Sequence, residues 1–566
     1  MFIQYHISIG NPYSHLVHIE MHITDVIDDE IVVAMPVWTP GSYMVREFPR
    51  NINTLSATTY EGEALSWEKI TKNRWRISSR NIKEMIISYE VYAFELTVRT
   101  SYVTDDFFML NGASIFLFIE NHLHLRHEVK ITAPHYEEVV STLNSREGIF
   151  WASDYDTLVD NPILGGKFEK SEFISANIPH TVYILEKGNY DLVRLTSDLQ
   201  KITNTEITMM GGIPCPKYHF YIINTDKIYG GLEHSCCSVN MVPRFNYDKD
   251  NYLNTISLLA HEYFHLWNVK TIAPQSLKKF NYNEENYTHL LWFVEGVTSY
   301  FDDYFVFSSG VSTVDEYLNI LSKNINTVMN SAGTGVQPLA DASFDAWIKY
   351  YRPNENTPNS QISYYTKGAV IALALHLYLL HKSEAEKGLD DLMRILYSKY
   401  LLHPSQGYTK NLLEEWTKEC LGISIELFLD TYVDGVAMPP LNELLQYGGA
   451  QLLATENAKY LIGYQFQYSH NQCIVQFVDN RFLNEVQELQ YGDEIIAVNG
   501  FRISDASWEK RLEEGQFGTN IHFLVNRMGI IREVSLPLDR KIQYKFAIQT
   551  LENISPLQQK IRNRWL

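Results

Sequence analysis

Hydrophobic and polar residues alternate through most of the first 165 residues. Segments such as HLVHIEMHI, RWRISS and EMIISYEVYAF are short, rich in β-branched and aromatic residues, and separated by turn residues. A period of two predicts β-strands with one buried and one solvated face. We therefore predict an N-terminal all-β domain of sandwich-like architecture over residues 1–165.

The spacing of hydrophobic residues becomes helical in the middle of the chain. Residues 217–224 and 229–241 keep a strand pattern, whereas from about Tyr252 to Gly435 apolar residues recur every three or four positions in most segments. This spacing is typical of amphipathic helices. Residues 166–440 are therefore predicted to form a mostly helical α+β domain.

A domain boundary is predicted at Pro439 and Pro440, because neighbouring prolines interrupt regular elements. Strand patterns return after Gly448, in CIVQFVD, DEIIAVNG and IHFLVNR, and the C-terminal tail is expected to be a short helix with a basic end. Residues 441–566 are predicted to form a third, β-rich domain. The expected fold class is therefore multidomain α+β.

Composition and charge exclude several classes of function. The chain has 566 residues, and 45% hydrophobic with 20% charged residues is an ordinary globular composition. Its 47 basic and 67 acidic residues give a net charge of −20, which argues against nucleic acid or an anionic membrane as a partner. We expect neither a membrane span nor a secretory signal, and five cysteines without a CxxC motif fit free thiols in a reducing cytoplasm.

The strongest chemical signal is the segment HEYFH, which places His261, Glu262 and His265 in a helical pattern. Residues four apart lie on one face of a helix, so both imidazoles can reach one metal ion at about 2.0–2.1 Å. Glu262 lies beside the pair and can accept a proton from a metal-activated water. The alternative is a structural helix with two incidental histidines.

A third metal ligand is expected from a second helix. Glu295 interrupts the apolar segment WFVEG, and a carboxylate in such surroundings needs a partner. A catalytic zinc usually takes three protein ligands and leaves one position for water. We predict one zinc per chain at His261, His265 and Glu295. A salt bridge is the structural alternative for Glu295, and His289 is the second candidate ligand.

Two further groups would complete a peptide-cleaving site. Tyr365 precedes the apolar helix predicted at 369–380, where its hydroxyl could donate to a developing oxyanion. Gly230 and Gly231 follow a strand and would let a substrate backbone approach, and Glu233 could pair with a free α-amino group. On spacing alone, a plain turn with an exposed carboxylate is the favoured interpretation of this segment.

Three segments together carry a family resemblance. MPVWTPGSY at Met35–Tyr43, HEYFHLWNVK at His261–Lys270 and LWFVEG at Leu291–Gly296 resemble signatures of the glycyl aminopeptidase family of zinc peptidases. These enzymes are relatives of thermolysin and aminopeptidase N and carry a C-terminal PDZ domain. The resemblance runs through the whole chain and implies a thermolysin-like catalytic domain over residues 166–440.

The resemblance also implies a role for each matching residue. His261, His265 and Glu295 match the zinc ligands of the family, and Glu262 matches its general base. Tyr365 matches the tyrosine of the Y-x-K-G pattern, which stabilises the tetrahedral intermediate in the aminopeptidase N group.

A second pattern of that group bears on the substrate amine. Glu233 matches the glutamate of G-x-M-E-N, which binds the amine, but Leu232 replaces the methionine and His234 replaces the asparagine. These departures leave the choice between exopeptidase and endopeptidase specificity open.

The C-terminal region resembles a PDZ module through YGDEIIAVNG at Tyr491–Gly500. Its carboxylate-binding loop is best matched by Leu461–Tyr464, which lacks the first glycine of the usual Gly-Φ-Gly-Φ pattern. Such a groove binds a peptide or protein C-terminus as an added strand. A purely structural module that shapes the active-site cleft is the alternative.

We therefore expect a cytoplasmic zinc metallopeptidase that acts as an aminopeptidase on peptides, with glycine or alanine as candidate N-terminal residues. A zinc endopeptidase and a binding scaffold built on a degenerate peptidase body are the alternatives. The complete set of three ligands and a base argues for an enzyme, because a degenerate body is expected to lose it.

Overall fold

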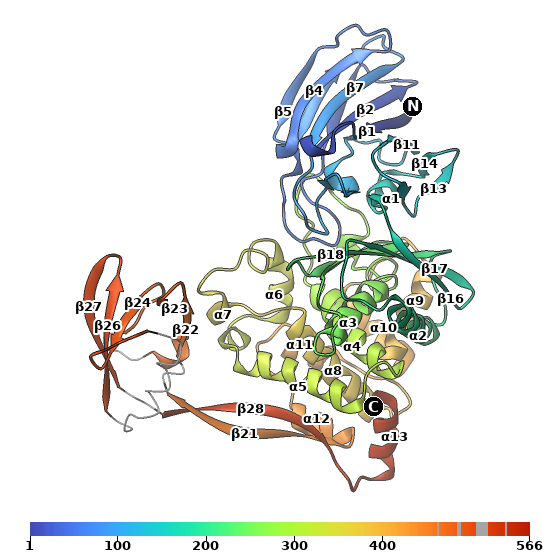
Figure 1. Cartoon of the computed structure of the whole chain (residues 1–566). Helices are drawn as coiled ribbons and strands as arrows, with labels where there is room; N and C mark the ends of the chain where they lie inside the picture. The colour runs from blue at the N-terminus through green and yellow to red at the C-terminus, as the bar shows by residue number, and fades with distance from the viewer. Residues whose placement is uncertain (461–462, 484–487, 505–518, 538–539) are drawn as a thin grey trace. The chain divides into compact units, whose positions relative to one another are not determined.

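The computed structural model describes residues 1–460, 463–483, 488–504, 519–537 and 540–566 (Figure 1). The chain divides into two compact units. Unit 1 contains Met1–Thr288, Phe301–Thr313 and Leu392–Leu412, and unit 2 contains His289–Tyr300, Val314–Asp391 and Leu413–Leu566. The predicted boundaries near residues 165 and 440 stay predictions.

Three β-sheets form the N-terminal part of unit 1. The largest has the order β13-β14-β11-β1-β2-β7-β4, and β1 pairs with β11 in parallel. Its strands are β1 (Phe2–Ser8), β2 (Leu16–Thr24), β4 (Ile52–Thr59), β7 (Met85–Tyr92), β11 (His127–Thr132), β13 (Asn144–Arg146) and β14 (Ile149–Ala152). One four-stranded sheet contains β3 (Glu30–Ala34), β5 (Trp67–Thr71), β6 (Arg74–Ser78) and β10 (Phe118–Ile119). The other contains β8 (Tyr102–Val103), β9 (Phe107–Leu110), β12 (Glu138–Val140) and β15 (Ile163–Gly166).

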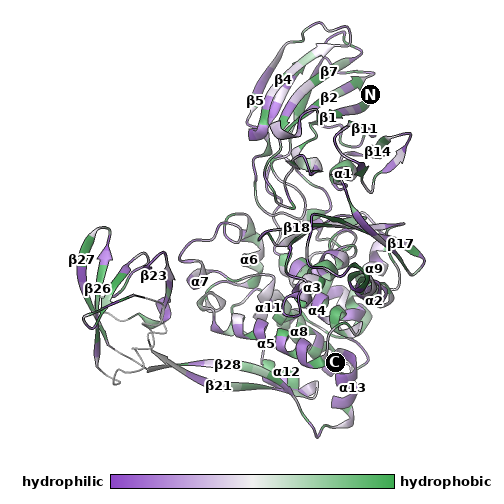
Figure 2. Ribbon diagram, in the orientation of Figure 1, coloured by the Kyte–Doolittle hydropathy of each residue, from purple (hydrophilic) through white to green (hydrophobic). Residues whose placement is uncertain are grey.

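The alternation in the sequence corresponds to the two faces of the seven-stranded sheet. Ile3, Tyr5 and Ile7 of β1 are buried, whereas the residues between them are not. Figure 2 shows the same alternation of hydrophobic and hydrophilic residues along the neighbouring strands. The prediction of a β-rich N-terminal region is confirmed, because burying every second side chain is what a period of two provides.

A mixed sheet in unit 1 carries part of the predicted site. Its order is β16-β17-β18-β20-β19, in which β17, β18 and β20 run parallel and β19 is an antiparallel edge strand. The strands are β16 (Glu169–Ser175), β17 (Ile178–Leu185), β18 (Tyr218–Thr225), β19 (Gly230–Glu233) and β20 (Cys237–Pro243). The single strand predicted at 229–241 is thus wrong, because the chain turns after Glu233, where His234 N–H donates to the carbonyl of Cys237.

Helix α2 (Leu192–Met210) was not predicted from the sequence. Its apolar stripe, which includes Leu195, Leu199 and Ile202, is diluted by threonine and asparagine, so its period is weak in the sequence. The side chain of Asp191 caps the helix by accepting from two backbone N–H groups of the first turn.

Most of the described residues in unit 2 before residue 448 are helical or lie in turns. A π-helical turn at Trp292–Gly296 leads directly into α4, and α8 is buried on nearly every side. Besides α2 and the C-terminal helix, the described α-helices of the two units are α1 (Tyr155–Val159), α3 (Tyr252–Phe264), α4 (Val297–Ser308), α5 (Val314–Asn330), α6 (Leu339–Phe344), α7 (Thr357–Ser360), α8 (Thr366–Lys382), α9 (Leu389–Leu402), α10 (Lys410–Leu421), α11 (Glu426–Tyr432) and α12 (Leu441–Tyr447). None of the helices in the described ranges combines the length and apolar character that a membrane crossing requires.

The C-terminal part of unit 2 returns to strands. A long antiparallel pair joins β21 (Ala450–Tyr460) to β28 (Arg540–Thr550). A second sheet has the order β22-β23-β24-β26-β27, with β25 beside β24. Its strands are β22 (Tyr464–Ser469), β23 (Gln472–Val478), β24 (Glu494–Val498), β25 (Phe501–Arg502), β26 (Asn520–Arg527) and β27 (Ile530–Pro537). Leu461 and Ile462 of the predicted carboxylate-binding loop lie outside the described residues.

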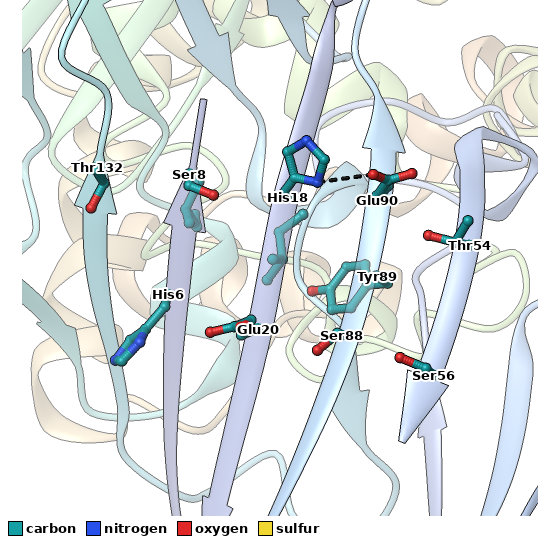
Figure 3. Close-up of a pocket in the computed structure, with 12 residues that line it drawn as sticks. His6, Ser8, His18, Glu20, Thr54, Ser56, Ser88, Tyr89, Glu90 and Thr132 are labelled. Atoms are coloured by element: carbon teal, nitrogen blue, oxygen red, sulfur yellow. Dashed lines mark ion pairs between the residues drawn. The ribbon is translucent and has the colours of Figure 1, made fainter. Parts of the chain in front are cut away.

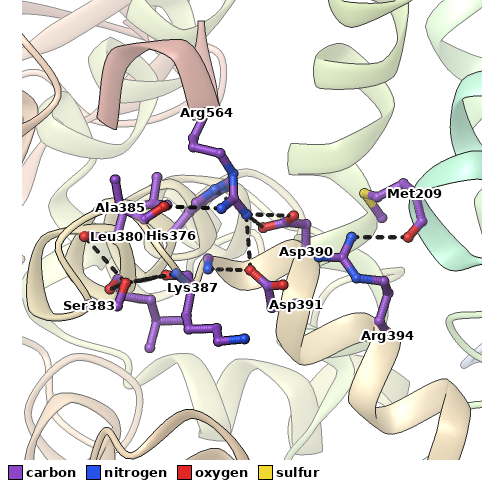
Figure 4. Close-up of polar contacts among 12 residues, drawn as sticks. Met209, His376, Leu380, Ser383, Ala385, Lys387, Asp390, Asp391, Arg394 and Arg564 are labelled. Carbon is purple, nitrogen blue, oxygen red and sulfur yellow. Dashed lines mark hydrogen bonds and ion pairs between the residues drawn. The ribbon is translucent and has the colours of Figure 1, made fainter. Parts of the chain in front are cut away.

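The predicted C-terminal helix is confirmed as α13 (Pro556–Trp565), which begins with a capping box at Ser555. Its basic end makes specific contacts in unit 2. The guanidinium of Arg564 donates to Asp390 and Asp391 of α9 at 2.9 Å (Figure 4). The buried indole of Trp565 donates to the carbonyl of Gly448.

Candidate active site

The two histidines of the HEYFH segment lie at the C-terminal end of α3. This helix begins at Tyr252 and ends at Phe264, so His265 is its capping residue, and the helical pattern of the sequence runs six residues further, through Lys270. Both imidazoles are buried, and their ring centroids are 4.6 Å apart. The four-residue spacing therefore brings the rings together as predicted.

Each imidazole has a hydrogen-bond acceptor at Nδ1. His261 Nδ1 lies 2.8 Å from Asp302 Oδ2, and His265 Nδ1 lies 2.5 Å from the carbonyl oxygen of Asn268. An acceptor at this position places the proton on Nδ1 and the lone pair on Nε2. Histidines that bind metals are oriented by partners of this kind.

Glu295 lies in the π-helical turn that precedes α4 and is 2% exposed. Glu295 stays the predicted third ligand of an ion held by His261 and His265. Two imidazoles and a carboxylate form a donor set that suits zinc. The runner-up ligand His289 instead stacks on Phe344, with ring centroids 4.6 Å apart.

Gly231 provides the space that the Glu262 carboxyl group occupies. A Cβ atom added to Gly231 would lie 2.2 Å from Glu262 Oε1 and 2.4 Å from its Cγ, distances that no real contact allows. At Gly230, which has φ +151°, the only described atom within 4 Å of an added Cβ is on the Arg99 guanidinium, at 4.0 Å. Only the second glycine therefore fits directly against the predicted base.

Glu233 at the end of β19 is buried rather than exposed. It is 4% accessible, and one of its oxygens lies within 4.8 Å of ligand atoms of Glu262 and His265. A Cβ atom on Gly41 would lie 2.6 Å from Glu233 Oε2, so this glycine, at φ +82°, packs against the carboxyl group. The interpretation of residues 230–234 as a plain turn with an exposed carboxylate is therefore wrong.

A charged cluster lies beside Glu233. Lys270 Nζ contacts Asp160 Oδ1 at 2.6 Å, and His234 Nδ1 lies 3.3 Å from the same oxygen. Although burial raises the pKa of Asp160, the charge of Lys270 and the hydrogen bond with His234 outweigh it and hold that pKa well below its usual range. Burial lowers the pKa of Lys270, but Asp160 and Glu233 more than compensate and raise it. Lys270 therefore stays charged next to Glu233.

Tyr365 stands at the start of α8, as predicted. Its hydroxyl lies 3.4 Å from the Tyr351 hydroxyl, which also accepts a hydrogen bond from Tyr364 at 3.2 Å. Burial and, next, the negative charge of Glu295 raise the pKa of Tyr365 well above its usual value. The Tyr365 phenol therefore remains protonated and can donate a hydrogen bond.

The glycines of the two motifs WFVEG and YTKG pack directly against each other in unit 2. A Cβ atom on Gly296 would lie 2.5 Å from Gly368 Cα, and one on Gly368 would lie 2.7 Å from Gly296 Cα. This close approach of two backbones explains why both motifs end in glycine. The same contact places the π-helical turn with Glu295 beside the start of α8, which follows Tyr365.

Sequence reasoning missed several residues around this site. They are Gly41, Asp160, Asn268, Lys270 and Asp302. Gly41, Asn268 and Lys270 lie in segments that were noticed for other reasons. Asp302 follows Glu295 by seven residues, a helical interval that could have suggested a common face.

Comparisons with known proteins identify relatives of this chain. Residues 4–167 match the model of the Peptidase M61 N-terminal domain, and residues 254–371 match the model described as M61 glycyl aminopeptidase. An aminopeptidase N family protein from Idiomarina loihiensis is 29% identical, with a TM-score of 0.91 over 99% of both chains. An M1 zinc metallopeptidase from Deinococcus radiodurans, 13% identical, shares the fold over 78% of this chain and 95% of its own, with a TM-score of 0.50. No curated protein matches the chain significantly. Two models of the M61 glycyl aminopeptidase family thus match parts of this chain, which is a peptidase.

Proposed function

We propose that this peptidase is a zinc-dependent aminopeptidase. The observation that carries the proposal is the position of Glu233. A buried carboxyl group lies within 4.8 Å of ligand atoms of both Glu262 and His265. A substrate ammonium bound there would place the first peptide bond of the substrate next to the predicted base.

His261, His265 and Glu295 would hold one zinc ion per chain. Bound zinc supplies Lewis acidity toward the scissile carbonyl and the attacking water. The donor set and the two Nδ1 acceptors fit this role.

Two side chains would carry the proton transfer and charge stabilisation. Glu262 takes a proton from the attacking water and then passes it to the leaving amine. Tyr365, kept protonated by burial and by Glu295, donates to the developing oxyanion. Gly231 leaves the room that the Glu262 carboxyl group needs.

Glu233 would select substrates with a free α-amine, and Gly230 and Gly231 would line the approach of the substrate backbone. Gly41 packs against Glu233 and limits the space around the bound amine. Small N-terminal residues such as glycine or alanine are our proposed substrates. A zinc endopeptidase is the competing possibility, because Leu232 and His234 depart from the amine-binding pattern of the aminopeptidase N group.

Amides of N-terminal amino acids and their N-acetylated counterparts test this proposal. We expect acetylation to lower kcat/KM of the wild type by about ten- to a hundred-fold or more, the value of a charged hydrogen bond. Glu233→Ala should lose a similar factor on free substrates and respond much less to acetylation. Equal cleavage of free and acetylated peptides by the wild type would establish the endopeptidase alternative.

A matched variant separates loss of the enzyme from loss of specificity. Glu262→Gln is nearly isosteric and should retain zinc while losing about 10²–10⁴-fold in kcat. Metal analysis of the same sample checks the zinc content. Full activity in Glu262→Gln would remove this residue as the base and favour the view that activity arises elsewhere.

We also propose that the C-terminal sheet is a PDZ-like module that binds a peptide or protein C-terminus. Support comes from β24 and β25, which flank the tight turn at Asn499 and Gly500 within the YGDEIIAVNG segment. The reducing cytoplasm remains the proposed location, since all five cysteines are free thiols.

A further inference from the structure

The polar face of the N-terminal seven-stranded sheet carries a second group of metal-ligating side chains. His6 of β1 is paired directly with Glu20 of β2, and Gln4 is paired with His22. His6, Glu20 and His22 therefore point to the same side of two neighbouring strands. We propose that these three residues form a second binding site for a divalent transition-metal ion such as Zn²⁺, separate from the peptidase centre.

The distances in this group suit a shared ion. One ligand atom from each of His6, Glu20 and His22 lies within 4.8 Å of the others, and His22 Nε2 is 3.4 Å from Glu20 Oε2. The imidazole centroids are 4.3 Å apart. Ligand atoms around a tetrahedral zinc lie roughly 3.3 Å apart, given bonds of about 2.0–2.1 Å. Small side-chain rotations would thus bring the three groups onto one ion.

A hydrogen-bond chain behind His6 fixes which ring nitrogen carries the proton. The amide of Gln4 donates from Nε2 to Glu128 Oε2 at 3.0 Å, so its oxygen faces His6. That oxygen lies 2.7 Å from His6 Nε2 and accepts its proton. The lone pair of His6 is then on Nδ1, available for ligation. An outer partner that sets the tautomer is typical of metal-binding histidines.

The group opens onto a pocket, as a site for an exchangeable ion requires. The pocket has a volume of about 500 Å³, and both His6 and Glu20 line it together with Ser8, His18 and Glu90. Figure 3 shows Glu20 directed from β2 towards the strand that carries His6. Water or a small oxygen ligand in this pocket could complete the coordination of an ion held by three side chains.

One positive charge opposes a cation here. Lys130 of β11 is the register partner of His6 on its other side. Its side chain is long and exposed, so it can turn towards solvent. We expect Lys130→Met to tighten binding of the second ion by roughly threefold at low salt, because it removes a like charge.

Metal counting on the whole enzyme tests the proposal. The holoenzyme is dialysed against buffered Zn²⁺ from nanomolar to high-micromolar free concentration, and bound zinc is measured per chain. We expect a second equivalent in the wild type. His22→Ala and His6→Ala should each weaken it by about 100-fold or more, since even outer partners are worth about 10–100-fold. Both variants should keep the first equivalent and full peptidase activity.

Control variants separate this site from the peptidase centre. His18→Ala changes a histidine on the same face that pairs with Glu90 at 2.9 Å, and it should retain the second equivalent. His261→Ala should lose the catalytic ion but keep the surface ion. Circular dichroism checks that each variant is folded. If His22→Ala is not folded, His22→Gln replaces it. Two outcomes overturn the proposal. In the first, the wild type binds only one equivalent of zinc and His22→Ala still binds that equivalent. In the second, the folded histidine variants bind the second equivalent as tightly as the wild type does.

Discussion

Among the residues that the structure describes, two proposed metal sites each combine two histidines with one glutamate, but their histidines lie in different surroundings. His261 and His265 lie one turn apart on a helix and are buried. His6 and His22 lie on neighbouring strands of a sheet, and His22 keeps 20% of its side chain exposed. The helical pair is visible in the sequence because its spacing is local, whereas the strand pair exists only through the register of β1 and β2.

The partners behind the two sets also differ. The helical histidines face a carboxylate and a backbone carbonyl, Asp302 and Asn268. His6 faces a neutral amide, Gln4, which is itself held by Glu128. Electrostatic interactions are stronger away from water. We therefore expect the buried peptidase site to bind its ion more tightly than the sheet site, and substitutions around it to have larger effects.

The largest effect is expected for a substitution next to the buried peptidase site. Gly231→Ala would place a methyl group 2.2 Å from Glu262 Oε1, so the carboxyl group must move. Displacement of a catalytic group by about 1 Å can cost about 10²-fold in rate. We expect that loss in kcat with little change in bound zinc, measured by steady-state kinetics and metal analysis.

Gly10→Ala is the control for a glycine-to-alanine change without crowding, because no described atom comes within 4 Å of its added Cβ and its φ is not positive. Its activity loss should be clearly smaller than that of Gly231→Ala. If the two variants lose the same activity, crowding of Glu262 is not the reason that Gly231 is a glycine.

The next effect concerns the partners of the histidines. Asp302→Asn should lower the zinc affinity of the peptidase centre by about 10–100-fold, because it removes the negative charge that orients the His261 ring and raises its basicity as a ligand. Gln4→Leu should weaken the second ion by about tenfold at most, since it removes a neutral partner. Competition with a chromophoric chelator measures both affinities. Equal losses would remove the distinction between the two sets.

The smallest effect concerns the buried face of the same N-terminal sheet. Burial lowers the pKa of His127 to about 4. The unfolded chain, with a pKa near 6.5, therefore takes up a proton that the folded chain excludes as the pH falls from about 6.5 to 4, and stability decreases in that window. Between pH 6.5 and 5.5 the loss from this residue is about 1 kcal/mol.

His127→Gln isolates this contribution. The difference in unfolding free energy between pH 6.5 and 5.5, measured with urea, should be about 1 kcal/mol smaller in the variant than in the wild type. An identical pH dependence would show that His127 is protonated in the folded state as easily as in the unfolded chain.

Much of the fold follows from local pattern, and the exceptions have physical causes. The N-terminal strands and α13 match their predictions, because alternation and a capping box are short-range signals. Helix α2 was missed because polar residues interrupt its apolar stripe. The end of α3 was misplaced, since the apolar pattern continues past Phe264 although the helix does not.

The predicted site shows the same division. The spacing of His261 and His265 predicted two adjacent imidazoles, and the structure has them. The burial of Glu233 and its contact with Gly41 could not be predicted, because these residues are nearly 200 positions apart. The role of Gly231 was also hidden, because the side chain that fills its space belongs to another element.

By itself, the sequence determined the β-rich start, the helical segments and the two histidines that one helical turn brings together, since these depend on residues within a few positions of each other. Only the tertiary structure decided which acceptors orient those histidines, which glycine makes room for Glu262, and that His6, Glu20 and His22 share one face of a sheet. Strand register, backbone approach and burial depend on residues far apart in the chain, and no local pattern encodes them.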